Sequence, residues 1–150
     1  MPKPIFVLNG PNLNLLGVRE PSIYGAETLE DVKRRTQARA QTLALSVDFR
    51  QSNLEGELVT WIQEAREQAS GIVLNAGAYT HTSIAILDAL NAAEKPVIEL
   101  HLSNVFRRES FRHHSYVAPA AQGLICGFGP KGYELAIEAM ADLLTGKAAR

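Results

Sequence analysis

The chain has 150 residues, about the length of one ordinary domain, and carries a formal net charge of −1. A nucleic-acid-binding domain would normally be clearly basic, so this balance argues against one. The longest apolar runs, 71–78 and 123–128, are of strand length and far too short to cross a bilayer. The single cysteine, Cys126, excludes an internal disulfide and predicts a cytoplasmic protein, and its apolar neighbours predict that it fills core space.

Strand-like segments alternate along the chain with segments whose apolar residues recur at helical spacing. In chain order, the expected strands are 5–8, 47–51, 71–75, 96–102 and 123–127. The helical positions between and after them are Leu29, Val32, Thr36, Ala40 and Leu43; Leu58, Ile62, Ala65 and Ala69; Ile84, Leu87 and Leu90; and Ala136, Met140 and Leu143. Thr28 is the expected cap of the first helix, while Pro130 and Gly146 bound the last. The alternation predicts one α/β domain over 1–150, a doubly wound five-stranded parallel sheet with helices on both faces.

Polar residues follow the first expected strand. Asn9, Asn12 and Asn14 lie in its connection to the next helix, together with a Gly-Pro turn at 10–11. Open α/β sheets bind ligands beyond the carboxyl ends of their strands, where such amides can bind a polar ligand or position a water. Asparagines are also common turn residues for local backbone reasons, so the pattern alone leaves both interpretations open.

A glycine-bounded loop at 17–25 carries Arg19 and Tyr24. A tyrosine can act as a general base only if a nearby cation favours its phenolate, because a free phenol has a pKa of about 10. Arg19 would be that cation, since arginine keeps its charge. Five residues of loop fix no geometry, however, so the spacing alone favours an ordinary exposed loop.

The fourth expected strand carries Glu99 and His101. Successive strand residues point to opposite faces, so these two side chains share one face of the sheet. A carboxylate beside an imidazole fixes its tautomer and favours its protonated form, which makes a competent general acid. A strand with one solvated face would give the same alternation, and the pattern does not separate the two hypotheses.

Cationic and polar residues near two other strand ends could bind an acidic substrate. Asn75 ends the third strand and His81 lies near the start of the following helix, a region suited to anions. Arg107, Arg108 and Arg112 follow the fourth strand, and a guanidinium can bind a carboxylate through two hydrogen bonds. The pattern does not choose among the three arginines, and solvated surface charge is the common alternative.

Several cofactor and metal motifs are missing from the sequence. It has no Cys/His spacing suited to zinc, no phosphate loop and no dinucleotide fingerprint. Every lysine falls outside the expected strand interiors, which disfavours a buried Schiff-base lysine. Acid–base chemistry without metal or cofactor remains the leading hypothesis. The alternatives are a non-catalytic flavin-binding module, a response-regulator receiver that lacks the usual acidic cluster, and an inactive relative of an enzyme.

Taken together, the segments resemble the type II 3-dehydroquinate dehydratases of the shikimate and quinate pathways. The resemblance runs from the first strand to the last helix and is carried by the motifs at 9–14, 17–25, 75–83, 99–104 and 111–115. It implies a flavodoxin-like fold with strand order 2-1-3-4-5. It also implies a lyase that removes water from 3-dehydroquinate by trans elimination, giving 3-dehydroshikimate without a cofactor.

The resemblance further implies a role for each catalytic position. Tyr24 is then the base that removes the proton α to the ketone, and Arg19 is the cation that sustains its phenolate. His101 is the acid that protonates the departing hydroxyl, and Glu99 orients it. Asn12 helps to hold a water against the enolate intermediate.

Substrate-binding positions and the oligomeric state follow from the same resemblance. The matching binding residues are Asn75, His81, Leu102, Ser103 and Arg112. Asp88, by pattern an exposed helical carboxylate, corresponds to a residue that the family supplies from a neighbouring subunit, in trimers assembled into a dodecamer. Many members carry histidine where this chain has Phe106, and we expect this difference to change local packing rather than activity.

Overall fold

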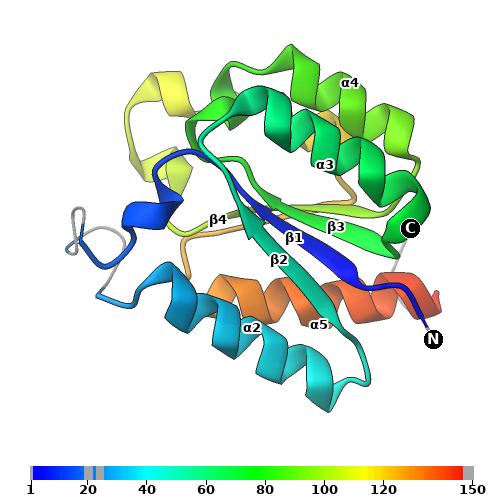
Figure 1. Ribbon diagram of the computed structural model, residues 1–150. Coiled ribbons are helices and arrows are strands. Elements are labelled where there is room, and N and C mark those ends of the chain that lie inside the picture. Colours follow the sequence, from blue (N-terminus) through cyan, green and yellow to red (C-terminus); the bar gives the residue numbers. More distant parts are fainter. Residues whose placement is uncertain (1, 19–21, 23–25, 147–150) are drawn as a thin grey trace.

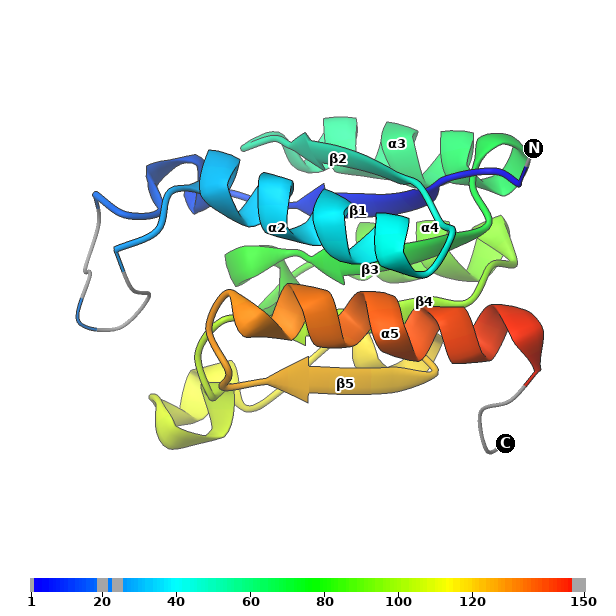
Figure 2. The ribbon, with the colours of Figure 1, turned by 90° about the horizontal axis from the view of Figure 1, so that it is seen from below.

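The protein forms a five-stranded, entirely parallel sheet covered by helices on both faces. A computed structural model describes residues 2–18, 22 and 26–146 (Figure 1). The strands are β1 (Ile5–Asn9), β2 (Val47–Gln51), β3 (Gly71–Asn75), β4 (Val97–His101) and β5 (Gly123–Cys126). Their spatial order is β2-β1-β3-β4-β5, which confirms the predicted doubly wound topology (Figure 2).

The long helices divide between the two faces of the sheet. They are α2 (Leu29–Thr42), α3 (Glu55–Gln68), α4 (Ile84–Ala93) and α5 (Lys131–Thr145). Helices α2 and α5 cover one face, and α3 and α4 cover the other (Figures 1 and 2). Short 3₁₀ turns complete the described chain: η1 (Leu13–Leu15), η2 (Gly77–His81), η3 (Val105–Arg107), η4 (Ser110–Arg112) and η5 (Ala118–Ala120).

Side-chain alternation in the central strands builds two separate cores. Phe6 and Leu8 of β1 pack with α3 and α4, whereas Ile5 and Val7 pack with α2 and α5. Strands β1, β3 and β4 are buried along their whole length, as expected for parallel strands covered on both sides. The α5 face takes Ile98, Leu100 and Leu102 of the β4 segment. Glu99 and His101 therefore point to the α4 face, as the alternation predicted.

The predicted helix signals are mostly confirmed. Thr28 caps α2 in a reciprocal capping box with Asp31, and Gly146 ends α5 at a φ of 75°. The prediction for the third helix was wrong in part, because Ile84 is exposed whereas Leu90 is buried. The buried positions of α4 are Ile86, Ala89, Leu90 and Ala93.

The prediction that Cys126 fills core space was also wrong in part. Cys126 is half-buried, because β5 lies at the edge of the sheet, where Leu124 is exposed. Strand β5 ends at Cys126 rather than at the predicted Gly127, because Gly127 has a φ of +96°, which an extended strand does not adopt.

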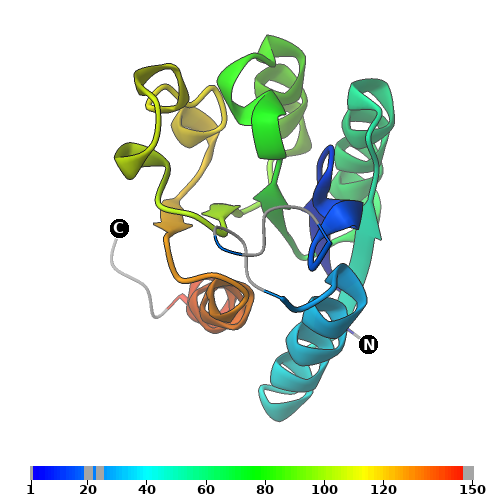
Figure 3. The same cartoon turned by 90° about the vertical axis from the view of Figure 1, so that its left-hand side faces the viewer.

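The loops that follow β1 and β3 touch each other at the end of the sheet. Asn9 and Asn75 lie side by side in the register of β1 and β3, and the Gly10 amide donates a hydrogen bond to the Asn75 carbonyl at 2.8 Å. A Cβ atom on Gly10 would lie 2.3 Å from the Ala76 carbonyl oxygen, so only glycine fits. The loops that follow β1, β3 and β4 thus gather at one end of the sheet (Figure 3).

Candidate active site

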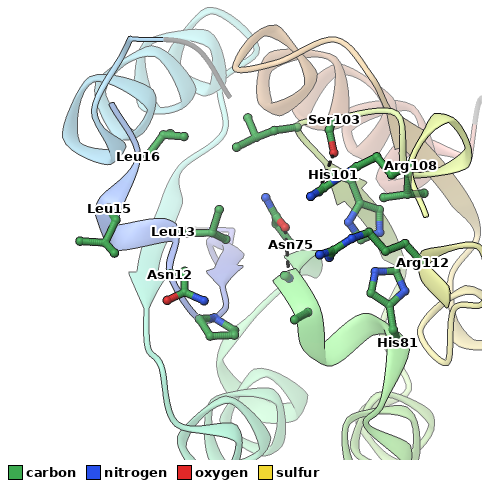
Figure 4. Close-up of a pocket in the computed structure, with 15 residues that line it drawn as sticks. Asn12, Leu13, Leu15, Leu16, Asn75, His81, His101, Ser103, Arg108 and Arg112 are labelled. Atoms are coloured by element: carbon green, nitrogen blue, oxygen red, sulfur yellow. Dashed lines mark hydrogen bonds between the residues drawn. The ribbon is translucent and has the colours of Figure 1, made fainter. Parts of the chain in front are cut away.

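A pocket of about 130 Å³ opens at the carboxyl ends of β1, β3 and β4. One wall comes from the β1 loop and η1, with Leu13, Leu15 and Leu16 as its apolar part (Figure 4). The opposite wall comes from the end of β4, the loop after it and the last residue of η2. Its polar members are His81, His101, Ser103, Arg108 and Arg112, and Asn75 lies between the two walls.

Glu99 and His101 form a buried pair behind the polar wall. The Glu99 carboxylate accepts a hydrogen bond from His101 Nε2 at 2.6 Å. The two residues are only 1% and 5% exposed, so the hypothesis of a solvated strand face was wrong. Bonding through one ring nitrogen fixes the orientation of the imidazole and leaves the other nitrogen for a ligand in the pocket.

His81 stacks beside His101, with ring centroids 6.4 Å apart. Its Nδ1 lies 2.8 Å from the His114 carbonyl oxygen, which can only accept, so Nδ1 carries the proton. Burial lowers the pKa of His81, and the nearby His101 and Arg112 act in the same direction. His81 is thus favoured as a neutral imidazole with its proton on Nδ1.

The two arginines of the polar wall lie on either side of Glu109. Arg112 donates from Nε to Glu109 at 2.9 Å, and Arg108 Nε lies 3.8 Å from the other carboxylate oxygen. The hydrogen bond from Arg112 lowers the pKa of Glu109. Because Arg108 and Arg112 both line the pocket and keep their positive charge, its wall favours an anionic ligand.

A chain of neutral hydrogen bonds supports the amide side of the pocket. Asn75 Nδ2 donates to the Tyr133 hydroxyl at 2.9 Å, and that hydroxyl donates to Asn9 Oδ1 at 2.6 Å. Asn9 in turn donates to the Arg50 carbonyl. Burial strongly raises the pKa of Tyr133, which therefore remains a neutral phenol.

Asn12 lines the pocket from the first loop in a left-handed backbone conformation, with a φ of 69°. Asparagine tolerates this region better than most residues, and the Asn53 side chain holds the turn by accepting from the Asn12 amide at 3.0 Å. Asn12 is therefore fixed by its backbone, and no hydrogen bond of its carboxamide is seen among the residues that the structure describes.

Most of the predicted site residues lie together at this pocket. Arg19 and Tyr24 lie outside the described residues. Asp88 lies exposed on α4 and does not line the pocket, so its role at a neighbouring subunit stays a prediction. Phe106 is half-exposed, with its ring 5.9 Å from that of His113.

Two residues of the site were not singled out from the sequence. Arg108 was one of three arginines that the pattern could not separate, and its position on the pocket wall distinguishes it from Arg107. Tyr133 follows no strand end, but it lies on the apolar face of α5 with Ala136 and Met140. A tyrosine on such a face needs a buried partner for its hydroxyl, which is the signal that could have found it.

Comparison with known proteins identifies relatives along nearly the whole chain. The family model described as Dehydroquinase class II matches residues 3–141. The chain is 61% identical over 143 residues to the 3-dehydroquinate dehydratase of Mesorhizobium japonicum, covering 95% of this chain and 99% of the relative. It is 57% identical to 3-dehydroquinate dehydratase 2 of Pseudomonas aeruginosa, covering 95% of this chain and 96% of the relative.

A solved structure gives the same result at the level of the fold. The type II dehydroquinase from Propionibacterium acnes superposes with a TM-score of 0.90 at 46% identity, over 94% of this chain and 97% of that one. Within the described part of the chain, no helix is both long and apolar enough to span a membrane.

Proposed function

The chain belongs to the Dehydroquinase class II family, and we propose that it catalyses the trans elimination of water from 3-dehydroquinate, giving 3-dehydroshikimate through an enolate. The observation that carries the proposal is the buried Glu99–His101 pair beside a pocket lined by two arginines. Such an elimination needs a base, an acid and stabilisation of the enolate.

His101 is the proposed general acid. Its proton passes to the departing hydroxyl group as the carbon–oxygen bond breaks, and the group leaves as water. Glu99 accepts from Nε2 at 2.6 Å and so supports the proposed role by holding the ring in one orientation. Its negative charge also stabilises the imidazolium before the proton is given up.

Tyr24 is the proposed general base, and Arg19 is the cation that favours its phenolate. This assignment comes from the family resemblance, because both residues lie outside the described part of the chain. The phenolate takes the proton α to the ketone, which leaves an enolate. A water held with the help of Asn12 then stabilises the enolate oxygen.

Arg112, His81, Asn75 and the 102–103 segment are the proposed binding groups. All of them line the pocket, and Arg112 carries the fixed positive charge that a substrate carboxylate needs. His81 Nδ1 is held by the His114 carbonyl, which leaves its other ring nitrogen for the substrate.

The same proposal includes trimers that assemble into a dodecamer and an Asp88 contributed by a neighbouring subunit. It can be tested by complementation, because a site that lacks Asp88 and one that lacks His101 would repair each other in a mixed oligomer. Co-expressed Asp88→Asn and His101→Ala chains should regain activity that neither variant has alone. A mixed oligomer as inactive as its parents would contradict the shared site.

The direct test of function is the ultraviolet absorbance of the conjugated enone that forms after 3-dehydroquinate is added. We expect the absorbance to rise with wild type and to be nearly absent with Tyr24→Phe, because phenylalanine cannot accept the proton. Full activity of Tyr24→Phe would contradict the base, and an inactive wild type would contradict the function. Borohydride added with substrate should not inactivate the enzyme, because no imine forms in this mechanism.

A further inference from the structure

Ser115 lies behind the acid pair, in the loop between η4 and η5. Its hydroxyl is 2.9 Å from each oxygen of the Glu99 carboxylate. The Ser115 hydroxyl oxygen also accepts hydrogen bonds from the backbone amides of Val117 at 3.1 Å and Ala118 at 3.0 Å. Ser115 therefore joins the backbone of this loop to the carboxylate that contacts His101.

The hydrogen-bonding capacity of the serine hydroxyl fixes the direction of these contacts. A hydroxyl has two lone pairs and one proton. The two amides occupy both lone pairs, so the proton of Ser115 is donated to Glu99, an acceptor-only group when ionised. The carboxylate consequently accepts from Ser115 on one side and from His101 on the other.

The loop that carries Ser115 is anchored to the rest of the protein. Val117 is fully buried in the core between the sheet and α3 and α4, and the Tyr116 amide donates to the Thr80 carbonyl at 2.9 Å. The His114 carbonyl on the other side of Ser115 accepts from His81. The contacts of the residues before and after Ser115 thus hold its hydroxyl at a fixed place beside Glu99.

We propose that Ser115 is a positioning residue for the acid: its hydroxyl holds the Glu99 carboxylate in the orientation in which it orients His101. This inference rests on the proposed function of the Glu99–His101 pair. The simpler alternative is that Ser115 only caps the η5 turn through the two backbone amides. In that case its contact with Glu99 has no effect on the rate.

A double-mutant cycle on kcat separates the two accounts. Ser115→Ala should lower kcat roughly ten- to one-hundredfold with little change in KM, the range expected when a hydrogen bond to a charged group is lost. In the Glu99→Gln background, the same substitution should have a much smaller effect, because its target is already altered. Ser115→Thr keeps a hydroxyl and should restore most of the rate.

Ser83→Ala is the matched control, because the Ser83 hydroxyl also accepts from a backbone amide at the start of a helix and is buried. It should lower stability but not kcat. Should Ser115→Ala fail to fold, Ser115→Cys can replace it in the cycle, because a thiol is a weak donor. The His101 ring nitrogen shifts, measured by NMR, should move in Ser115→Ala and stay unchanged in Ser83→Ala.

The outcomes distinguish this inference from the function on which it rests. Equal slowing by Ser115→Ala in both backgrounds, or full kcat in Ser115→Ala while Glu99→Gln is slow, would overturn the inference alone. Full kcat in Glu99→Gln would overturn the role of Glu99 in the proposed reaction and, with it, the role of Ser115.

Discussion

Two buried polar clusters border the pocket, one on its β4 side and one on its β1 and β3 side, and they differ in their chemistry. On the β4 side, Glu99 and His101 form a pair that can carry charge and exchange protons. On the β1 and β3 side, Asn9 and Asn75 are joined by the neutral phenol of Tyr133. We propose that the Glu99–His101 pair moves protons in the reaction, whereas Asn9, Asn75 and Tyr133 supply fixed donors and acceptors without adding charge.

The largest expected effect is the loss of the acid on the β4 side. His101→Ala should lower kcat by roughly 10²- to 10⁴-fold, the usual contribution of a positioned acid or base. Asn75→Ala on the amide side should act mainly on KM, because it removes a binding group rather than a proton donor. Steady-state kinetics measure both variants. Equal changes in the same parameter, kcat or KM, would contradict the different roles proposed for His101 and Asn75.

Arg112 tests whether the charged side also binds substrate. Arg112→Lys keeps the charge but loses the planar donor fork, so KM should rise roughly ten- to one-hundredfold while kcat changes less. Arg39→Lys is the matched control, since Arg39 pairs with Glu138 on the helices α2 and α5, away from the pocket. An unchanged KM in Arg112→Lys would remove Arg112 from the binding site.

The amide side should show its largest effect in stability. Tyr133→Phe leaves Asn9 and Asn75 with an unpaired buried group each, so the free energy of unfolding should fall by about 1–3 kcal/mol. The Tyr79 hydroxyl instead donates to an exposed carbonyl that water can reach. Tyr79→Phe should therefore change the free energy of unfolding by only about 0.5 kcal/mol or less. Urea unfolding measures both, and equal losses would argue against a special role for the buried network.

The smallest expected effect concerns His81, which links the two sides. Its folded-state pKa is lowered mainly by burial, so the unfolded chain binds a proton more readily than the folded one. The stability that neutral His81 contributes is present above its ordinary pKa of 6.5 and is lost as the pH falls through the lowered value. The advantage of wild type over His81→Asn in urea unfolding should therefore shrink on going from pH 7.5 to pH 5, and an advantage that grows would contradict the sign.

Local signals in the sequence predict most of the fold. The Thr28 cap and the stripe from Leu58 to Ala69 are confirmed because they depend on neighbours within a few turns. The inward face of α4 could not be predicted in the same way. That helix is apolar almost all round, so its sequence does not reveal which side meets the sheet.

In the site, too, the residues at strand ends could be predicted from the sequence, whereas contacts between distant segments could not. The ends of parallel strands meet at one edge of a sheet, which is why Asn75 and His101 could be assigned to one pocket. Tyr133 lies 58 positions from Asn75, and Ser115 lies 16 positions from Glu99 in an irregular loop. Neither contact leaves a periodic signal, because each depends on how separate segments pack.

In the proposed mechanism, His101 donates the proton for water loss and is not needed to remove the α proton. This role can be tested by NMR of 3-dehydroquinate in deuterated water with His101→Ala. We expect the α position to exchange its proton for deuterium while almost no 3-dehydroshikimate forms. Loss of both exchange and elimination in a variant that still binds substrate, or elimination at the wild-type rate, would contradict it.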